Sequence, residues 1–274
     1  MISQSITPGA SEQDVANEFW PSRSDLDQLF RLKYGDPQRV GWCPRLMYRY
    51  GYFTPDVYYE GLVAKLVREG QPWLDVGGGR DLFPHNPPLA ASLAERSGCV
   101  VGVDPSDTLE ENPFVHDKIK ANIEDFQDSR TFPLVTLRMV AEHITHPQRA
   151  VEALARLTMS GGYVIVYTIN LWSPLSWASL LIPFSLHHPI KRYLWRTEEK
   201  DTFPVAYKMN TRRQLRNLFA SAGFRERKFA YLSDCRAFAR FRLLFRMELM
   251  TWRALQSLGL VYPENCLLGV YERV

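Results

Sequence analysis

The stretch Pro72–Asp81, PWLDVGGGRD, gives the clearest indication of the fold of this chain. Its first half is apolar enough for a short buried strand, and it runs directly into Gly77, Gly78 and Gly79. A helix is predicted to follow over 89–96. Glycines between a strand and a helix let backbone N–H groups approach a ligand that side chains would block. The alternative interpretation is a tight strand-to-helix turn that needs glycine for its shape alone.

A second buried strand is predicted at Cys99–Asp104, CVVGVD. At its end, the carboxylate of Asp104 can accept hydrogen bonds from both hydroxyls of a ribose. The alternative is a surface turn before Pro105. A dinucleotide site needs G-x-G-x-x-G, and the third glycine would fall at Leu82. The loop therefore argues against a nucleotide-dependent oxidoreductase, which is kept as an alternative.

Strands and helices are predicted to alternate along the rest of the chain. The further strands are predicted at 116–121, 132–140, 163–169, 224–232 and 266–271, and the further helices at 54–70, 147–157, 210–223 and 237–258. This alternation predicts an α/β domain with a doubly wound, mostly parallel, seven-stranded sheet covered by helices on both faces. In such a sheet the ligand binds at the carboxyl ends of the strands.

Two segments fall outside this pattern. Residues 1–53 are rich in aromatic residues, and we expect them to be an irregular N-terminal extension of a domain at 54–274. Residues 171–206 are interrupted by prolines and are expected to form a lid insertion. Both are predicted to cover the carboxyl edge of the sheet and to form the acceptor pocket. The alternative is that they only cover apolar edges of the sheet.

Composition excludes several other classes. The net charge of +3 over 274 residues is too small to indicate nucleic-acid binding. None of the four cysteines forms a C-x-x-C pair, so zinc and redox motifs are not supported. Scattered cysteines favour a cytoplasmic location, although four also suffice for two disulfides, and the first residues do not resemble a signal peptide. The uncharged stretch 161–188 contains Pro174 and Pro183, so we expect a lid or a segment dipping into a surface rather than a membrane span.

Seven short motifs occur in a fixed order, namely LDVGGGRD (74–81), VVGVDP (100–105), ANIED (121–125), VAEHI with HP (140–147), LTMSGG (157–162), TIN (168–170) and the run 201–224 with FPVAYKMNTRRQL and SAGF. Together they resemble the motifs of class I S-adenosylmethionine-dependent methyltransferases. The last run resembles a subgroup often found with polysaccharide and glycolipid genes. The resemblance covers about residues 54–274 and implies a Rossmann-like methyltransferase fold with S-adenosyl-L-methionine as the cofactor.

The resemblance also implies a role for individual residues. Asp75 would orient the amino-acid moiety of the cofactor, and Asp104 would hold its ribose. The other implied contacts are Gly77, Gly78 and Gly79 with the cofactor backbone, Pro105 beside the ribose, Asn122 and Ile123 with adenine, and Arg138 and Met139 near the sulfonium. Two positions depart from the family pattern, because Asp81 replaces the third motif glycine and Pro133 replaces the usual acid before the fourth strand.

The acceptor side has two candidate catalytic residues. If the acceptor is a hydroxyl, a general base contributes about 10²–10⁴-fold to the rate. His143 is the first candidate because it follows the fourth strand, and Tyr207 is a weaker one. The alternative for His143 is a histidine that packs near the sheet at the start of a helix. Some relatives bind a metal with Glu-x-x-Glu-His, but Met139 replaces the first acid here, so we expect no metal site.

The sequence thus predicts a methyltransferase acting on a hydroxyl or an amine of a small-molecule, sugar or glycolipid acceptor. The late helix carries several arginines among apolar residues, a pattern that fits peripheral contact with an anionic membrane. Its alternative is an ordinary helix with a solvated basic face. A non-catalytic binding module with the same fold is the other alternative, kept open by Asp81 and Pro133. The oligomeric state is not predicted.

Overall fold

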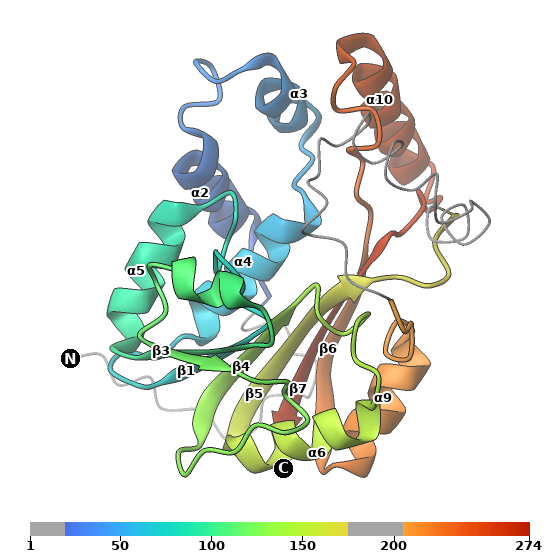
Figure 1. Cartoon of the computed structure of the whole chain (residues 1–274). Coiled ribbons are helices and arrows are strands. Elements are labelled where there is room, and N and C mark those ends of the chain that lie inside the picture. Colours follow the sequence, from blue (N-terminus) through green and yellow to red (C-terminus); the bar gives the residue numbers. More distant parts are fainter. Residues whose placement is uncertain (1–19, 175–204) are drawn as a thin grey trace, which may run out of the picture.

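The computed structural model describes residues 20–174 and 205–274, which form one twisted sheet with helices on both faces (Figure 1). The sheet has seven strands in the order β3-β2-β1-β4-β5-β7-β6, and β7 runs antiparallel to β5 and β6. The strands are β1 (Trp73–Val76), β2 (Val100–Asp104), β3 (Asp117–Lys120), β4 (Phe132–Arg138), β5 (Thr158–Ile169), β6 (Phe224–Leu232) and β7 (Cys266–Arg273). The predicted doubly wound, mostly parallel sheet is confirmed.

Two helical layers cover the sheet (Figure 1). One layer holds α2 (Arg23–Tyr34), α4 (Pro55–Leu66) and α5 (Pro87–Ser97), and the other holds α6 (Pro147–Leu157) and α9 (Arg212–Ser221). Because side chains alternate along a strand, Trp73 packs into the first layer and its neighbour Leu74 into the second. The sheet therefore separates two hydrophobic clusters, as parallel strands buried on both faces require.

The described part of the N-terminal extension is not irregular, so that prediction was wrong. Residues 23–34 and 42–50 form the helices α2 and α3 (Trp42–Tyr50). Ser22 and Asp25 make a reciprocal capping box that begins α2. Its buried residues, Leu26, Leu29 and Phe30, follow the three- and four-residue spacing of a helix face. This helical spacing is visible in the sequence, but the many aromatic residues around it made the segment look irregular.

The loop before β5 differs from the prediction. Gly161 and Gly162 were expected to end the preceding helix, but β5 already begins at Thr158 and contains both glycines. The register between β4 and β5 shifts between Phe132 and Leu134, on either side of Pro133. Proline cannot donate a ladder hydrogen bond, which fits a position at a bulge. Gly161 has φ 72°, a left-handed conformation that suits the turn inside this irregular pairing.

Other boundaries move by a few residues. Helix α4 ends at Leu66 rather than near Gly70, and α10 (Arg242–Ser257) begins five residues after Ala237, where the late helix was predicted to start. A short 3₁₀ helix, η1 (Asp107–Glu111), follows β2. Most of the predicted lid, 175–204, lies outside the described residues.

Two further expectations concern the environment of the chain. All four cysteines are free thiols, so the alternative of two disulfides is not realised. Within residues 20–174 and 205–274, no helix combines the length and the apolar composition that a membrane span needs.

Candidate active site

The glycine loop after β1 is crowded by the protein's own atoms. A β-carbon on Gly77, which has φ 74°, would lie 2.1 Å from Cγ2 of Val140, and one on Gly78 would lie 2.5 Å from Oδ2 of Asp75. At Gly79 the backbone conformation is the constraint, because φ is 45° while the nearest atom is 3.8 Å away. The loop thus needs glycine at two positions for space and at Gly79 for conformation. The predicted contact of all three with the cofactor stays a prediction.

Asp104 joins the two loops at the carboxyl ends of β1 and β2. Its Oδ2 accepts a hydrogen bond of 3.0 Å from the backbone N–H of Gly79, and its Oδ1 accepts one of 2.7 Å from the N–H of Ser106. Each carboxylate oxygen has a second lone pair, so both atoms can still accept a hydroxyl. The side chain is buried, whereas its neighbour Pro105 is exposed. Asp104 therefore has the place and the acceptor capacity that a ribose site needs.

The predicted adenine loop lies beside Asp104. The backbone N–H of Ala121 donates to the carbonyl of Asp104 at 3.2 Å, which places Asn122 and Ile123 immediately after that contact. Asn122 is exposed, but Ile123 is buried in the second hydrophobic cluster. Of the two, Asn122 is the side chain that remains open to solvent.

Asp75 is a buried acid at the base of the glycine loop. Its Oδ1 accepts a hydrogen bond of 2.6 Å from the hydroxyl of Thr136, which in turn accepts one from the indole of Trp73. Burial raises the pKa of Asp75 to about 7, although the Thr136 hydrogen bond and the charge of Arg138 act against this shift. A carboxylate held so firmly, and so poorly solvated, is suited to receive a cation such as an ammonium group.

Arg138 and Met139 follow at the end of β4. Arg138 is partly exposed and lies 3.9 Å from Oδ1 of Asp56. Met139 has φ 55°, a conformation that an L-residue with a side chain rarely adopts, and its N–H donates to the carbonyl of Tyr167 at 2.7 Å. Backbone outliers of this kind cost about 1–3 kcal/mol and occur often at functional sites.

The two candidate catalytic residues lie next to each other although they are far apart in the sequence. The backbone N–H groups of Ala206 and Tyr207 both donate to the carbonyl of Glu142, at 2.7 Å and 3.2 Å. Tyr207 therefore lies beside His143, and both side chains are partly exposed. Tyr207 also has a left-handed backbone, with φ 53°.

Glu142 is turned away from this edge into the protein. Its Oε2 accepts a hydrogen bond of 2.7 Å from Thr168, whose hydroxyl accepts one of 2.9 Å from Asn210. Burial raises the pKa of Glu142. Through its carbonyl, Glu142 holds the segment that carries Tyr207, and through its side chain it contacts Thr168, so its contacts in the structure are structural. Among the described residues, no three His, Cys, Asp or Glu side chains are grouped closely enough to hold a metal ion.

A charged cluster that includes Arg138 was not predicted from the sequence. It consists of Lys33, Asp56, Glu60, Arg138 and Arg236. Lys33 lies 2.7 Å from Oε1 of Glu60, and their side chains are only 1% and 3% exposed. Arg236 lies 2.9 Å from Oδ2 of Asp56. The local sequence contains little that indicates this cluster: Lys33 lies on α2, the helix whose apolar residues pack into the core.

The charged cluster is compensated internally. Asn86 donates to Oε2 of Glu60 at 2.9 Å, and burial still raises the pKa of Glu60. Burial acts to raise the pKa of Asp56 as well, but the charges of Arg236, Lys33 and Arg138 outweigh it and the pKa is lowered. Asp56 therefore remains ionised and ties the start of α4 to β4 and to the segment before α10.

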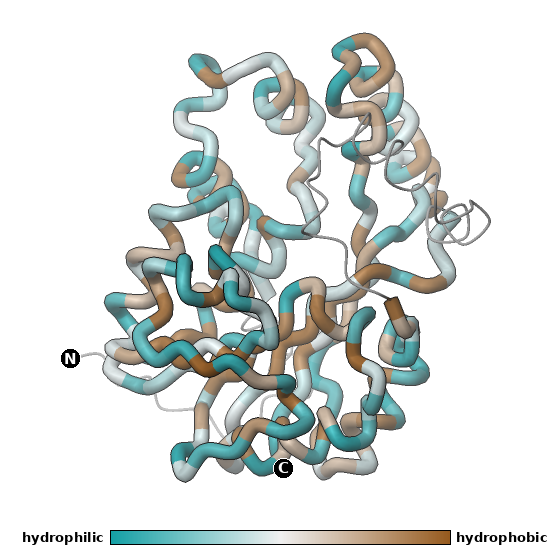
Figure 2. The backbone as a smooth tube through the Cα atoms, viewed as in Figure 1, coloured by the Kyte–Doolittle hydropathy of each residue, from teal (hydrophilic) through white to brown (hydrophobic). Residues whose placement is uncertain are grey.

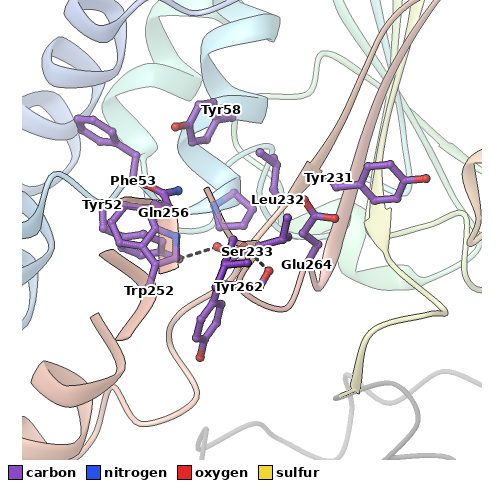
Figure 3. A pocket seen from close by; sticks show the side chains of 13 residues that line it. Tyr52, Phe53, Tyr58, Tyr231, Leu232, Ser233, Trp252, Gln256, Tyr262 and Glu264 are labelled. Carbon is purple, nitrogen blue, oxygen red and sulfur yellow. Dashed lines mark hydrogen bonds between the residues drawn. The ribbon is translucent and has the colours of Figure 1, made fainter. Parts of the chain in front are cut away.

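A separate pocket of about 220 Å³ lies between α4, the end of β6 and α10 (Figure 3). Tyr52, Tyr58 and Trp252 are among the aromatic side chains that line it. The hydroxyl of Tyr52 donates to the carbonyl of Ser233 at 3.1 Å and accepts from the N–H of Cys235 at 2.8 Å. None of the predicted site residues lines this pocket in the described part of the chain, so it is distinct from the candidate active site.

Comparison with known proteins identifies the family. A family model described as "Methyltransferase domain" matches residues 54–227. The chain belongs to this methyltransferase family. The family uses S-adenosylmethionine, which agrees with the predicted cofactor. The buried carboxylate of Asp104 at the end of β2 has the acceptor capacity that fits the ribose of this cofactor.

Curated relatives point the same way. The ubiquinone biosynthesis O-methyltransferase of Pectobacterium atrosepticum is 26% identical over 182 residues, which cover 62% of this chain and 66% of that protein. The enzyme of the same name from Vibrio atlanticus is 26% identical over 180 residues, covering 61% of this chain and 65% of that protein. The chain thus matches slightly less than two thirds of the length of these relatives.

Solved structures confirm the fold. The geranyl diphosphate C-methyltransferase of Streptomyces coelicolor, solved with S-adenosyl-L-homocysteine, has a TM-score of 0.51 and 13% identity, covering 98% of this chain and 100% of that one. The [4+2]-cyclase SpnF has a TM-score of 0.50 and 13% identity, covering 98% and 99%. One fold thus serves methyl transfer and cyclisation, so the reaction has to be argued from the site.

Proposed function

We propose that this chain transfers a methyl group from S-adenosylmethionine to a hydroxyl oxygen of a small-molecule acceptor, with His143 as the general base. The observation that carries the proposal is the pair of backbone hydrogen bonds from Ala206 and Tyr207 to the carbonyl of Glu142, which hold Tyr207 beside His143. His143 follows β4, so this contact lies at the same carboxyl edge of the sheet as Asp104 and the glycine loop. Oxygen is favoured over nitrogen because the curated relatives are named O-methyltransferases.

The residues of the chain divide the work between binding and proton transfer. Asp104 would hold the ribose hydroxyls, and Asp75, with Arg138 nearby, would orient the amino-acid end of the cofactor. When bound, the cofactor supplies a methyl group already activated by its sulfonium charge. The acceptor oxygen would form the new C–O bond as the C–S bond breaks, while the imidazole of His143 accepts the hydroxyl proton. Orientation and exclusion of water supply the rest of the rate.

The acceptor class is a finer proposal. The names of the relatives make hydroxylated intermediates of ubiquinone biosynthesis the first candidates. Lipid-linked and glycan-linked alcohols form the second set, because the run 201–224 resembles methyltransferases found with glycolipid genes. A cytoplasmic location is proposed as well, supported by the four free thiols.

The test is a mass-spectrometric screen of both acceptor sets, followed by kinetics on any product that gains one methyl group. His143→Gln is expected to lower the turnover rate about 10²–10⁴-fold, because it removes the base and leaves the cofactor site intact. His146→Gln is the matched control, since His146 is exposed three residues away. Calorimetry with S-adenosylhomocysteine should give the same affinity for both variants and the unaltered chain.

Two results would refute parts of the proposal. If S-adenosylmethionine and S-adenosylhomocysteine give no binding heat, the chain is a non-catalytic module with this fold. If methyl transfer occurs and His143→Gln matches His146→Gln, another group accepts the proton, and Tyr207→Phe is the next variant to measure.

A further inference from the structure

Helix α10 carries an apolar stripe on the side that faces away from the protein. Its inner side is buried against the core and α3, through Phe245, Leu249 and Trp252. Leu243, Met247 and Met250 follow at intervals of four and three residues. At about 100° per residue these three positions lie opposite the buried side. They are 69%, 55% and 49% exposed, so the helix presents hydrophobic side chains to solvent on its outer side.

The stripe is the main exposed apolar surface of the described residues. The segments flanking α10 extend it, because Phe238, Leu258 and Val261 are 45%, 72% and 70% exposed. Nine of the fifteen large hydrophobic side chains exposed in residues 20–174 and 205–274 fall between Phe238 and Val261. We call this surface the outer face of α10. Concentration of exposed apolar groups in one place marks an interaction surface rather than the usual scatter.

The charge next to the outer face is of one sign. Arg242, Arg246 and Arg253 lie along one flank of the helix, and Arg242 and Arg246 are exposed. Glu248 is the only acid between Arg236 and Pro263. It is buried, and it accepts hydrogen bonds from the hydroxyl of Tyr262 and the N–H of Phe238. The flank of the helix beside the stripe is therefore basic, and the one acid of this segment is turned inward.

We propose that the outer face of α10 binds an anionic lipid surface, with the apolar stripe entering the interface and the flanking arginines contacting the phosphates of the headgroups. The positive charge beside the stripe favours a lipid surface over a second copy of the chain. A two-fold pair would bring identical basic flanks together, which repels, whereas a surface of lipid phosphates complements them. This inference rests on α10 alone and does not depend on the proposed function.

The place of α10 gives the binding a consequence for the acceptor. Figure 1 shows α10 beyond the end of the sheet at which the parallel strands finish, and Figure 2 shows hydrophobic stretches along it there. This is also the end that carries Asp104 and His143. A chain bound through α10 would hold its candidate active site near the lipid surface, where a lipid-borne acceptor would lie.

The test is co-sedimentation of the full chain with vesicles of phosphatidylcholine alone and of phosphatidylcholine with phosphatidylglycerol. We expect binding to the anionic vesicles that weakens as salt screens the charges. Arg242→Gln with Arg246→Gln should weaken it about 25-fold, since each basic residue near such a surface contributes about fivefold. Leu243→Glu with Met247→Glu should abolish it. Leu32→Glu is the matched control, because Leu32 is a 45% exposed leucine on α2.

Affinity for S-adenosylhomocysteine and the melting temperature should stay unchanged in all these variants, which separates loss of lipid binding from loss of folding or of the proposed function. Absence of vesicle binding by the unaltered chain would overturn the proposal, as would equal binding to neutral vesicles or full binding by Leu243→Glu with Met247→Glu. A dimer seen by light scattering that Met247→Glu dissociates would assign the outer face to a second copy of the chain instead.

Discussion

The loops at the carboxyl ends of β1 and β2 and the charged cluster are held together in different ways. At these loops, Gly79 and Asp104 are joined by a backbone-to-carboxylate hydrogen bond, and each belongs to a short motif that contains a buried strand. In the charged cluster, Lys33 and Glu60 come from two helices, and the partners Asp56 and Arg236 are 180 residues apart. Local motifs therefore describe the first region, whereas only long-range packing creates the second.

The largest expected effect comes from deleting residues 1–50. The deletion removes α2 and α3, and with them the buried side chains Phe30 and Met47 that pack on the same cluster as α4 and α5. We expect the shortened chain to lose its cooperative unfolding transition, measured by circular dichroism. If the extension only formed an acceptor pocket, the shortened chain would still fold and bind S-adenosylhomocysteine. Long-range packing with the extension would then not be needed for folding.

Lys33→Met tests the buried ion pair directly. Glu60 would keep Asn86 as a partner but would lose the charge that compensates it, which costs about 3–5 kcal/mol of unfolding free energy for a buried pair. Denaturant titration measures the loss. Arg31→Met is the control on the same helix, because its pair with Asp27 is exposed and is expected to contribute less than about 1 kcal/mol. Equal losses in the two variants would show that burial adds nothing here.

The buried carboxyl group of Asp75 is expected to make the free energy of unfolding depend on pH. Its pKa is raised from 3.8 to about 7, so the folded chain binds this proton more tightly than the unfolded chain does. The contribution of Asp75 to stability therefore falls as the pH rises from about 4 to about 7. Asp75→Asn removes this penalty and should gain on the order of 4 kcal/mol relative to the unaltered chain between these limits. If the profiles of unfolding free energy against pH were parallel for the two chains, the expected effect of Asp75 would be contradicted.

Asp104→Ala is expected to have the smallest of these effects. It should weaken the binding of S-adenosylhomocysteine by about 1.5–3 kcal/mol, the range for hydrogen bonds to a charged group. Asp107→Ala is the control, because its side chain is 83% exposed in the neighbouring η1. Isothermal titration calorimetry measures both affinities. A loss of a few tenths of a kcal/mol in both variants would make Asp104 a turn residue that holds Gly79 and nothing more.

Most of the fold could be predicted, because strands with continuous apolar runs and glycine-terminated helices are local features. The helix at 147–157 was predicted with the observed bounds, since Val151, Leu154 and Leu157 follow its period. The helices α2 and α3 were missed although Ser22 and Asp25 formed a capping signal. The β5 start was also misplaced, because pairing with β4 across the bulge at Pro133 is a property of two strands and not of one.

Local sequence patterns are enough to specify the β1 strand, the glycine loop and the position of Asp104 at the end of β2. These follow from buried apolar runs and from backbone conformations that glycine alone adopts freely. Which charged groups are buried and paired depends on the packing of the whole chain. Glu142 accepts a hydrogen bond from Thr168, and Lys33 forms an ion pair with Glu60. A buried charge is tolerated only where such partners compensate it, and here they come from distant segments. Packing brings these partners together, and a local sequence pattern contains no information about it.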